Sequence, residues 1–379
     1  MPESRLKILH TGLSLEPGGM ENGLVNVAGL LDPAAFDVHV CCLERRGSFA
    51  DRLPNPANVT VLDKPQGFSW PTVLGLAKVI WRLEPDVIHS HNLGPLVYSV
   101  AATGLGMWRP ILHGEHGQLI NEQLTPPFLK RRRHYYRACR KVHTVSNSLR
   151  LHLIGLGFAP EKIISITNGV DTSRFTPVSR EAARQKLNLP TAGPFIGIVG
   201  RFEKNKRHAD LFEAFAKLVQ RIPTAQMLVV GGGGPENDRI IALGKASPAA
   251  GQIHFTGFQS DPRPYYQAMD LLASPSFFEG LSNAVLEAMA CGVPALCHNA
   301  CGNTEVVTND VDGFVADLTS VDRLALRLGN ILADPSRLAE VSRKARAKVE
   351  KDFSITSMVR GYEKVYRELA GRSGMPNGQ

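Results

Sequence analysis

The sequence from Leu271 to Cys297, LLASPSFFEGLSNAVLEAMACGVPALC, contains a strand, a loop, a helix and a second strand in that order. Leu271 to Ala273 and Ala295 to Cys297 are short apolar runs, which are typical of buried strands. Between them, Ala284 to Ala290 reads as a helix that a Gly-Val-Pro turn ends. Two strands joined through a helix are the building unit of a parallel sheet. This stretch therefore predicts an α/β fold.

The same alternation runs through both halves of the 379-residue chain. Apolar runs that fit buried strands begin at residues 6, 38, 59, 87, 111, 142 and 163, and a second series begins at 195, 227, 253, 271, 295 and 314. Helical patterns such as Met20 to Leu31 and Ala209 to Val219 lie between them. We expect two tandem Rossmann-like, doubly wound α/β domains that face each other across a cleft.

Domain boundaries follow from the restart of this pattern. The first domain is expected over residues 1–172 and the second over residues 173–354, because a Pro-rich polar stretch separates the two series of strands. Residues 355–379 contain an amphipathic helix, Ile355 to Leu369, which we expect to pack back toward the N-terminal domain. A chain of this length is too long for one comfortable core, which also favours two domains.

Composition points to an ordinary globular enzyme, with 43% hydrophobic and 21% charged residues. The six cysteines form no C-x-x-C pair, so we expect free thiols in a reducing compartment. No signal peptide is evident, and the longest uncharged run in the first half, Asn92 to Trp108, is too interrupted for a membrane span. The sequence therefore predicts a cytoplasmic protein, either free or peripheral on the inner face of the cytoplasmic membrane.

One segment concentrates the formal net charge of +8. Between Gln123 and Pro160 there is no acidic residue, and aromatic residues are interleaved with the basic ones. Two interpretations stay open: a solvated basic helix, or a surface for an anionic membrane. Nucleic-acid binding is not expected, because no recognised binding module accompanies the patch. The candidate membrane residues are Lys130, Arg131, Arg132, Arg133 and Arg137.

The loop that follows the strand Phe195 to Val199 is rich in cations. Arg201 and Lys206 lie where open α/β sheets bind ligands, beyond the carboxyl end of a strand. Arginine matches two phosphate oxygens with its planar fork, and lysine adds a compact charge. The loop therefore suits a diphosphate, although a solvated turn has the same composition.

The loop before the helix Ala284 to Ala290 is more specific. Gly280 permits a tight backbone, and Ser282 or Asn283 can cap the helix, whose free N–H groups attract anions. Glu279 precedes this turn and Glu287 follows it. Carboxylates accept hydrogen bonds from neighbouring hydroxyls, so the pair suits a ribose or a sugar ring.

At this point a family resemblance is evident. The sequence EGLSNAVLEAMACGVP, residues 279–294, resembles the signature of the retaining glycosyltransferases of family four, the "group 1" family of GT-B fold. Gly200-Arg201 with Lys206 is similar to the phosphate loop of that family. Gly231 to Pro235 and Gly18-Gly19-Met20-Glu21 resemble its two other glycine-rich loops. The resemblance covers nearly the whole chain.

The resemblance implies an N-terminal acceptor-binding domain and a C-terminal nucleotide-sugar-binding domain. Arg201 and Lys206 would neutralise the donor diphosphate, Glu287 would hold the ribose, and Glu279 would lie beside the donor sugar. His116 matches the active-site histidine of the family better than His113 does. The other residues implied at the site are Phe258 near the base, Gly280, Leu281, Ser282 and Asn283 at the phosphates, and Gly18, Gly19 and His91 in the acceptor and phosphate loop.

The predicted reaction moves a hexose or N-acetylhexosamine from a nucleoside-diphosphate sugar, UDP-linked or alternatively GDP-linked, with retention of configuration. The acceptor is expected to be a saccharide or lipid-linked saccharide in surface-polysaccharide synthesis. No cofactor and no metal are expected: Asp310-Val311-Asp312 reads as a surface turn, and the histidines at residues 89, 91, 113 and 116 lack nearby carboxylate spacing.

Three other classes were compared with this prediction. A nucleotide-sugar epimerase or a phosphorylase of similar fold remains an alternative, as does a non-catalytic nucleotide-sugar-binding protein. A dinucleotide-dependent oxidoreductase is disfavoured, because the loop after the first strand, Thr11 to Gly19, does not read G-x-G-x-x-G.

Overall fold

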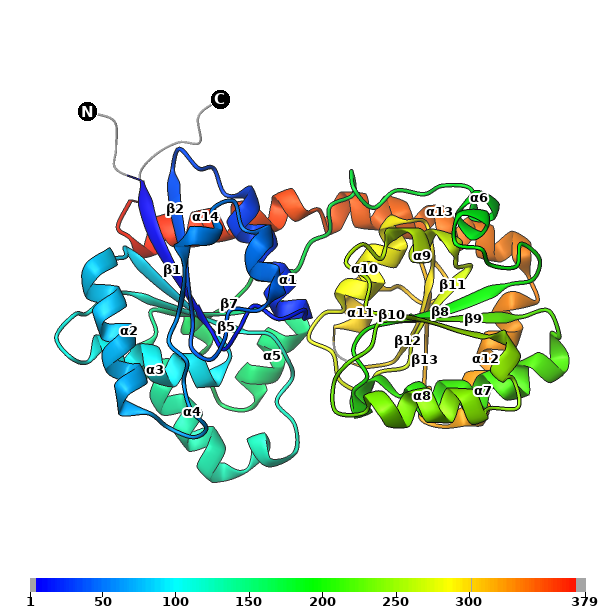
Figure 1. Ribbon diagram of the computed structural model, residues 1–379, viewed down its shortest axis with the longest axis horizontal. Helices are drawn as coiled ribbons and strands as arrows, with labels where there is room; N and C mark the ends of the chain where they lie inside the picture. Colours follow the sequence, from blue (N-terminus) through cyan, green and yellow to red (C-terminus); the bar gives the residue numbers. More distant parts are fainter. Residues whose placement is uncertain (1–4, 301, 373–379) are drawn as a thin grey trace. The chain divides into compact units, whose positions relative to one another are not determined.

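The computed structural model describes residues 5–300 and 302–372. It divides into two compact units, one formed by Met1–Asn168 with Thr356–Gln379 and the other by Gly169–Ile355 (Figure 1). Each unit is a parallel sheet covered by helices, which confirms the predicted pair of doubly wound α/β domains. Five of the cysteines are buried free thiols, and the sixth, Cys301, lies outside the described residues.

The N-terminal unit is built on a seven-stranded sheet in the order β3-β2-β1-β4-β5-β6-β7. All of its pairings are parallel, as buried strands joined by helices require. The order reverses direction beside β1, and ligands bind doubly wound sheets at such a point. The strands are β1 (Leu6–Gly12), β2 (Phe36–Cys42), β3 (Val59–Val61), β4 (Val87–His91), β5 (Ile111–Glu115), β6 (Lys141–Thr144) and β7 (Ile163–Ser165).

Helices cover both faces of this sheet (Figure 1). One face, which carries His10 and His89, meets the first helix and the last helix of the chain, while the opposite face packs on the remaining helices. The first group is α1 (Gly19–Leu30) and α14 (Ile355–Leu369), and the second is α2 (Trp70–Leu83), α3 (Leu93–Thr103), α4 (Pro126–Ala138) and α5 (Asn147–Gly155).

The C-terminal unit repeats this architecture with six strands in the order β10-β9-β8-β11-β12-β13, again all parallel. Its largest core cluster lies between the sheet and α7, α8 and α12 (Figure 1). The strands are β8 (Phe195–Val199), β9 (Gln226–Val230), β10 (Ile253–Gly257), β11 (Leu271–Ser274), β12 (Ala295–His298) and β13 (Phe314–Ala316). The helices are α6 (Arg180–Lys186), α7 (His208–Arg221), α8 (Asn237–Ala246), α9 (Arg263–Ala268), α10 (Asn283–Ala290), α11 (Asn303–Val306), α12 (Val321–Leu332) and α13 (Pro335–Asp352).

The chain passes between the units at two adjacent places. Val170 forms a parallel bridge with Ser354, and a side chain added at Gly169 would overlap the backbone of Ser354 and Ile355. The units therefore divide at Asn168 and at Ile355, a few residues from the boundaries expected at 172 and 354. Most of α14 belongs to the N-terminal unit, where the Tyr366 hydroxyl lies 2.8 Å from His89 Nδ1.

Every expected strand is present, with ends shifted by one or two residues in most cases. β1 and β4 extend beyond the apolar runs to Gly12 and His91, because their polar ends are buried and paired. Among the residues that the structure describes, none of the helices is both long enough and apolar enough to cross a membrane.

Candidate active site

The two glycine-containing loops after β8 and β9 are packed backbone against backbone. Gly231 has φ 124°, and a Cβ there would overlap the carbonyl oxygen of Gly200. The amide of Phe202 donates to the carbonyl oxygen of Gly233 at 3.0 Å. The backbone N–H of Gly233 in turn donates to Asn237 Oδ1 at 2.8 Å. These contacts fix the start of the cation-rich loop at the carboxyl end of the sheet.

Arg207 holds the other end of that loop, a role that the sequence analysis missed. It is 5% exposed, with φ 57°, and its guanidinium donates to the backbone carbonyls of Pro275 and Thr319 and to the carboxylate of Asp210. The same group lies 4.1 Å from the ring centroid of Phe277. Arg207 therefore ties the loop after β8 to the loop after β11.

Lys206 and Glu279 meet across these two loops. The ammonium Nζ donates to Glu279 Oε1 at 2.5 Å, and the side chains are 21% and 13% exposed. Lys206 also lines a small hollow with Ser276, Ser282 and Ala284 at the carboxyl ends of β8 and β11. The structure thus brings one predicted cation, one predicted acid and the start of α10 together.

The start of α10 has the geometry expected for an anion site. Ser282 has an extended backbone at the N-cap position, but its hydroxyl makes no capping hydrogen bond, contrary to the capping role that the sequence allowed it. Its carbonyl accepts the amides of Val285 and Leu286 at 3.2 Å. The Gly280 backbone packs tightly on Gly302, where an added Cβ would overlap it. The helix start therefore has a fixed position, and its N-cap residue Ser282 supplies no side-chain hydrogen bond to it.

Glu287 lies one turn into α10. Its Oε2 accepts a hydrogen bond from the buried hydroxyl of Tyr266 at 2.8 Å, and burial beside this carboxylate raises the Tyr266 pKa well above its usual value. Tyr266 on α9 thus orients the carboxylate, and the sequence analysis did not single it out. The hydrogen bond joins residues on two helices, 21 positions apart in the chain, so nothing in the sequence around Tyr266 indicates it.

Arg201 and Phe258 are the most open of the predicted donor-site residues. The Arg201 side chain is 53% exposed, with Nε 3.6 Å from Glu203 Oε1, and Phe258 is 55% exposed. Arg201 follows Gly200 directly, and the Phe258 amide lies close to Gly232. Both residues lie on loops that border the predicted phosphate site.

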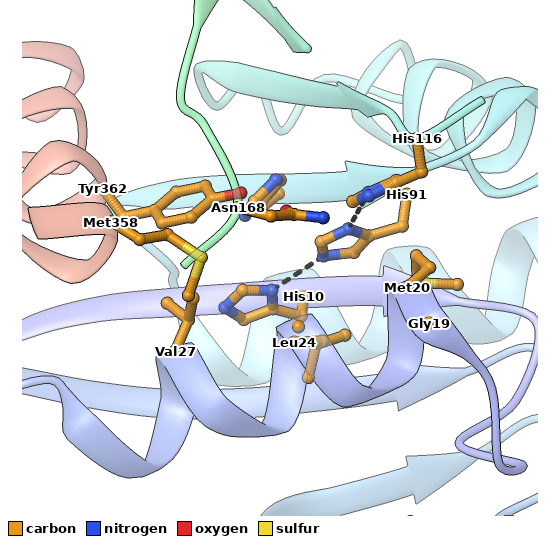
Figure 2. Close-up of a pocket in the computed structure, with 12 residues that line it drawn as sticks. His10, Gly19, Met20, Leu24, Val27, His91, His116, Asn168, Met358 and Tyr362 are labelled. Carbon is orange, nitrogen blue, oxygen red and sulfur yellow. Dashed lines mark hydrogen bonds between the residues drawn. The ribbon is translucent and has the colours of Figure 1, made fainter. Parts of the chain in front are cut away.

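A second predicted group, Gly19, His91 and His116, lines one cavity of the N-terminal unit. Figure 2 shows this cavity between the histidines, α1 and α14, with Leu24, Val27, Met358 and Tyr362 along its wall. Gly18 precedes α1 in extended conformation, and a Cβ there would overlap the Glu21 carboxylate. The structure therefore brings the predicted N-terminal residues to the switch point beside β1 and β4.

The histidines of this cavity form a hydrogen-bonded cluster. His91 Nδ1 lies 2.9 Å from His116 Nε2, and His91 Nε2 lies 2.9 Å from His10 Nδ1 (Figure 2). Burial lowers the pKa of His10 to about 3 and that of His116 to about 4, and it lowers the His91 pKa well below its usual value. The rings are therefore neutral at neutral pH.

Strand register explains this cluster, which the sequence analysis recognised only in part. His10 on β1 is the paired neighbour of His89 on β4, and His91 is two residues further along the same strand face. His143 on β6 joins them through a 2.8 Å contact with His89 Nε2. His10 and His143 were not predicted, because their approach to His89 depends on the register of β1 and β6 in the sheet.

Three of these rings, His10, His89 and His91, have nitrogens within 4.8 Å of one another, close enough to share a metal ion. Each ring is already hydrogen-bonded to another ring or to a tyrosine, so a cation would have to displace those bonds. The Asp310 to Asp312 segment forms a turn. Asp312 Oδ1 accepts the Thr308 amide at 2.7 Å, and Asp310 pairs with Arg327 at 2.9 Å.

The basic segment forms α4, and one of its expected membrane residues is misplaced. Arg132 is 5% exposed and donates to the buried carboxylate of Glu115, so the expectation that it faces a membrane is wrong. The neighbouring His113 ring and the Arg132 guanidinium keep the Glu115 pKa low, at about 2, despite burial. Arg133 is half-buried and donates to the Leu156 carbonyl at 2.7 Å. The exposed cations of the set are Lys130, Arg131 and Arg137.

Two doubly wound domains, with a cation-rich loop and a helix start at the strand ends of the second, define the GT-B class. Two family models match this chain: "Glycosyltransferase Family 4" over residues 17–174 and "Glycosyl transferases group 1" over residues 179–348. The chain belongs to glycosyltransferase family 4, the group 1 family.

Characterised relatives are distant. A D-inositol 3-phosphate glycosyltransferase of Rhodococcus jostii is 32% identical over 219 residues, which are 56% of this chain and 48% of the relative. The match thus spans about half the length of relatives of this kind. A UDP-Gal:alpha-D-GlcNAc-diphosphoundecaprenol alpha-1,3-galactosyltransferase of Escherichia coli is 24% identical over 97% of this chain and 98% of its own length.

Solved structures share the fold over nearly the whole chain. Anabaena Alr3699/HepE in complex with UDP-glucose superposes with a TM-score of 0.86 at 23% identity, covering 96% of this chain and 100% of that one. Sucrose-phosphate synthase from Thermosynechococcus elongatus gives a TM-score of 0.83 at 21% identity, covering 97% and 100%. These likenesses establish the two-domain architecture.

Proposed function

We propose that the protein is a retaining glycosyltransferase that moves a hexose or N-acetylhexosamine from a nucleoside-diphosphate sugar, with UDP as the nucleotide, to a saccharide or lipid-linked saccharide. The observation that carries the proposal is the contact of Lys206 with Glu279 beside the start of α10. A cation, a carboxylate and a helix N-terminus at one strand end suit a diphosphate joined to a sugar.

The donor residues divide by chemistry. Lys206, Arg201 and the N–H groups at the start of α10 would bind the diphosphate, with the backbone of Gly280 to Asn283 around it. Glu287, oriented by Tyr266, would accept hydrogen bonds from the ribose hydroxyls. Glu279 would lie beside the donor sugar, and Phe258 beside the base. UDP is favoured because the UDP-glucose complex of Alr3699/HepE shares this architecture.

The reaction follows from where charge develops. The bond between the anomeric carbon and the diphosphate oxygen breaks, and the acceptor oxygen forms its bond to the same face of the sugar. The acceptor proton passes to an oxygen of the departing diphosphate. Fixed cations and helix N–H groups stabilise that growing negative charge without a metal, which is electrostatic catalysis by preorganised groups. His116 and His91, with Gly18 and Gly19 at the start of α1, would contact the sugar or the acceptor.

The test of this proposal is a transfer assay with UDP-glucose, UDP-galactose, their N-acetyl forms and a GDP-sugar, each with and without an undecaprenyl-diphosphate saccharide. We expect UDP release that depends on the acceptor and a product whose anomeric configuration, read by NMR, equals that of the donor. An inverted product contradicts retention. Conversion of the free nucleotide-sugar without acceptor supports the epimerase instead, and binding without turnover supports the non-catalytic alternative.

A lipid-linked acceptor implies contact with a membrane, and the N-terminal unit has a suitable surface. All three tryptophans of the sequence, Trp70, Trp81 and Trp108, are 62–69% exposed. Trp70, Leu74 and Trp81 share the outer face of α2 at spacings of four and seven residues. Helix α3 lies between α2 and α4, so the exposed cations of α4 belong to the same helical layer (Figure 1). Tryptophan with lysine and arginine is the composition of an interfacial membrane surface.

Vesicle binding tests this part of the proposal. We expect sedimentation with phosphatidylglycerol vesicles, little sedimentation with phosphatidylcholine, and a blue shift of tryptophan emission on binding. Reversing the charges of Lys130, Arg131 and Arg137 to Glu should abolish both signals, since each cation near the surface is worth about 1 kcal/mol. The control reverses three exposed cations of the C-terminal unit, Lys186, Lys245 and Arg343. Equal vesicle binding by both triple variants would indicate that α4 is a solvated basic helix that does not contact the membrane.

A further inference from the structure

Glu287 is the only acidic side chain of α10, and it lies on the one face of this helix that is incompletely buried. Asn283, Ala284 and Glu287 are half-buried and share that face, because they are three and four residues apart. Ala284 lines the hollow that also contains Lys206. Glu287 therefore lies one helical turn, about 5 Å along the axis, from the hollow proposed for the diphosphate. The remaining residues of the helix are buried: Val285, Leu286, Ala288, Met289 and Ala290.

The carboxylate of Glu287 has a fixed partner in Tyr266. The hydroxyl of Tyr266, a residue with 0% exposure, donates to Glu287 Oε2 at 2.8 Å. Burial, together with the nearby charge of Glu287, raises the pKa of Tyr266 well above its usual value, so the hydroxyl keeps its proton. A carboxylate has no proton to give. The direction of this hydrogen bond is therefore determined: the tyrosine donates and the glutamate accepts.

Tyr266 is in turn held in place because α9 is anchored. The guanidinium Nε of Arg184 on α6 donates to the carbonyl of Ala268 at 2.9 Å, at the C-terminal end of α9. Within α9, Gln267 Nε2 donates to the carbonyl of Thr176 at 2.8 Å. Groups outside α10 therefore fix the helix that carries the tyrosine hydroxyl, and Glu287 meets a donor whose position does not depend on a nucleotide.

A fixed hydrogen bond limits how the carboxylate of Glu287 can rotate. The last torsion of a glutamate side chain is broad, so an unrestrained carboxylate samples many orientations of its plane. Ribose carries two neighbouring hydroxyls, and a carboxylate accepts hydrogen bonds from both only when its plane is directed at them. The hydrogen bond from Tyr266 removes part of this orientational freedom before the nucleotide binds, which lowers the cost of ordering the site. A sugar with a single hydroxyl gains less from the same preorganisation.

We propose that Tyr266 is a positioning residue that, by holding the Glu287 carboxylate, makes the donor site selective for ribonucleotides over deoxyribonucleotides. The inference rests on the proposed function, in which Glu287 receives the ribose hydroxyls. A hydrogen bond to a charged group contributes about 10- to 100-fold in affinity, so a nucleotide that lacks either ribose hydroxyl binds more weakly by that factor. Tyr266 contributes to this preference without touching the nucleotide.

Calorimetric titration with UDP, 2′-deoxy-UDP and 3′-deoxy-UDP measures this preference. The wild-type protein should bind each deoxynucleotide about 10 to 100 times more weakly than UDP, and Tyr266→Phe should reduce that ratio about tenfold, mainly because UDP binds more weakly. The ratio of two affinities in one protein does not depend on the fraction that is folded, so partial misfolding of a variant does not mimic the result. Tyr265→Phe is the matched control and should keep the wild-type ratio, because this neighbouring tyrosine is half-buried and its hydroxyl makes no hydrogen bond to the described residues.

A double-mutant cycle tests whether Tyr266 acts through Glu287. Glu287→Gln should reduce the preference at least as much as Tyr266→Phe does, and combining the two changes should alter the ratio no further. Equal weakening of UDP and both deoxynucleotides by Tyr266→Phe would show a merely structural tyrosine and overturn the inference, as would an additional loss in the double variant. Failure of the wild-type protein to bind UDP would overturn the proposed function together with this inference. UDP binding with the same preference in the wild-type protein and in Tyr266→Phe would overturn the inference alone.

Discussion

The ammonium of Lys206 lies 2.5 Å from a carboxylate oxygen of Glu279, although the two residues belong to different strand-end loops. Arg207, the next residue, ties those loops together through the carbonyl of Pro275. The pair is therefore held by the fold at the place where the donor diphosphate and sugar are proposed to meet.

Replacing Glu279 with Gln separates catalysis from nucleotide binding. The variant keeps the side-chain shape but removes the negative charge beside Lys206, so UDP affinity should stay equal or rise slightly. Turnover should fall by about a hundredfold or more, the usual effect of losing one preorganised electrostatic group. Glu203→Gln is the control and should retain turnover; Glu203 lies on the loop that carries Lys206, with its carboxylate 3.6 Å from Arg201 Nε. Parallel loss of UDP affinity and turnover in Glu279→Gln would argue against this role.

Gly231→Ala should disrupt the packing of the two glycine-containing loops. A Cβ at residue 231 would overlap the Gly200 carbonyl, and overpacking of this kind costs about 1–3 kcal/mol in addition to the strain of the positive φ. Gly233→Ala is the matched control, because its φ is also positive, at 68°, while no atom lies within 4 Å of the added Cβ. Urea unfolding should show a larger loss for Gly231→Ala. Equal losses would mean that the contact with Gly200 is unimportant.

Arg132 and Arg131 should differ strongly despite being neighbours. Arg132→Met leaves the buried Glu115 carboxylate without its cation, which typically costs about 3–5 kcal/mol of unfolding free energy. Arg131→Met alters an exposed residue and should change stability by less than about 0.5 kcal/mol. Chemical denaturation of both variants checks the difference. A small effect of Arg132→Met would indicate that Glu115 is protonated or solvated.

The buried histidines should make the protein acid-sensitive. Burial lowers the pKa of His10 from 6.5 to about 3 and that of His116 from 6.5 to about 4. Below pH 6.5 these histidines therefore bind protons in the unfolded chain but stay neutral in the folded chain. The free energy of unfolding falls as the pH drops, until the folded histidines are protonated as well. Each histidine contributes a slope of about 1.4 kcal/mol per pH unit in this window.

Urea unfolding at pH 7.5 and pH 5.0 measures this effect. His10→Gln should reduce the stability difference by about 2 kcal/mol, the share of one such histidine at pH 5. His134→Gln, an exposed histidine on α4, should leave the difference unchanged. Identical unfolding free energies at the two pH values would show that these rings are solvated or already charged in the fold.

Much of the fold could be predicted because buried parallel strands are continuous apolar runs, and each expected strand is present. The position of Glu279 and Glu287 around the start of α10 was predictable for a related reason, since their spacing along the chain is local. His10, His143 and Tyr366 could not be found in this way. They reach the histidine cluster through strand register and through a helix more than 200 residues further along the chain, neither of which local spacing records.

Arg132 shows the opposite limit. A run of four basic residues predicts an exposed, charged helix. Helical geometry nevertheless turns one of them, Arg132, toward the interior, where it pairs with Glu115 at the end of β5. The sequence carried the acid, but 17 residues away, and its pairing depends on the tertiary packing of α4 against β5.

Calorimetric titration of UDP into the wild-type protein and into Lys206→Ala tests the central claim most directly, with Lys204→Ala, an exposed cation of the same loop, as the control. We predict that UDP binds the wild-type protein and Lys204→Ala alike and binds Lys206→Ala about 10 to 100 times more weakly, the effect of losing one charge-assisted hydrogen bond. Equal affinity for UDP in all three proteins, or no binding to the wild-type protein, would contradict the account.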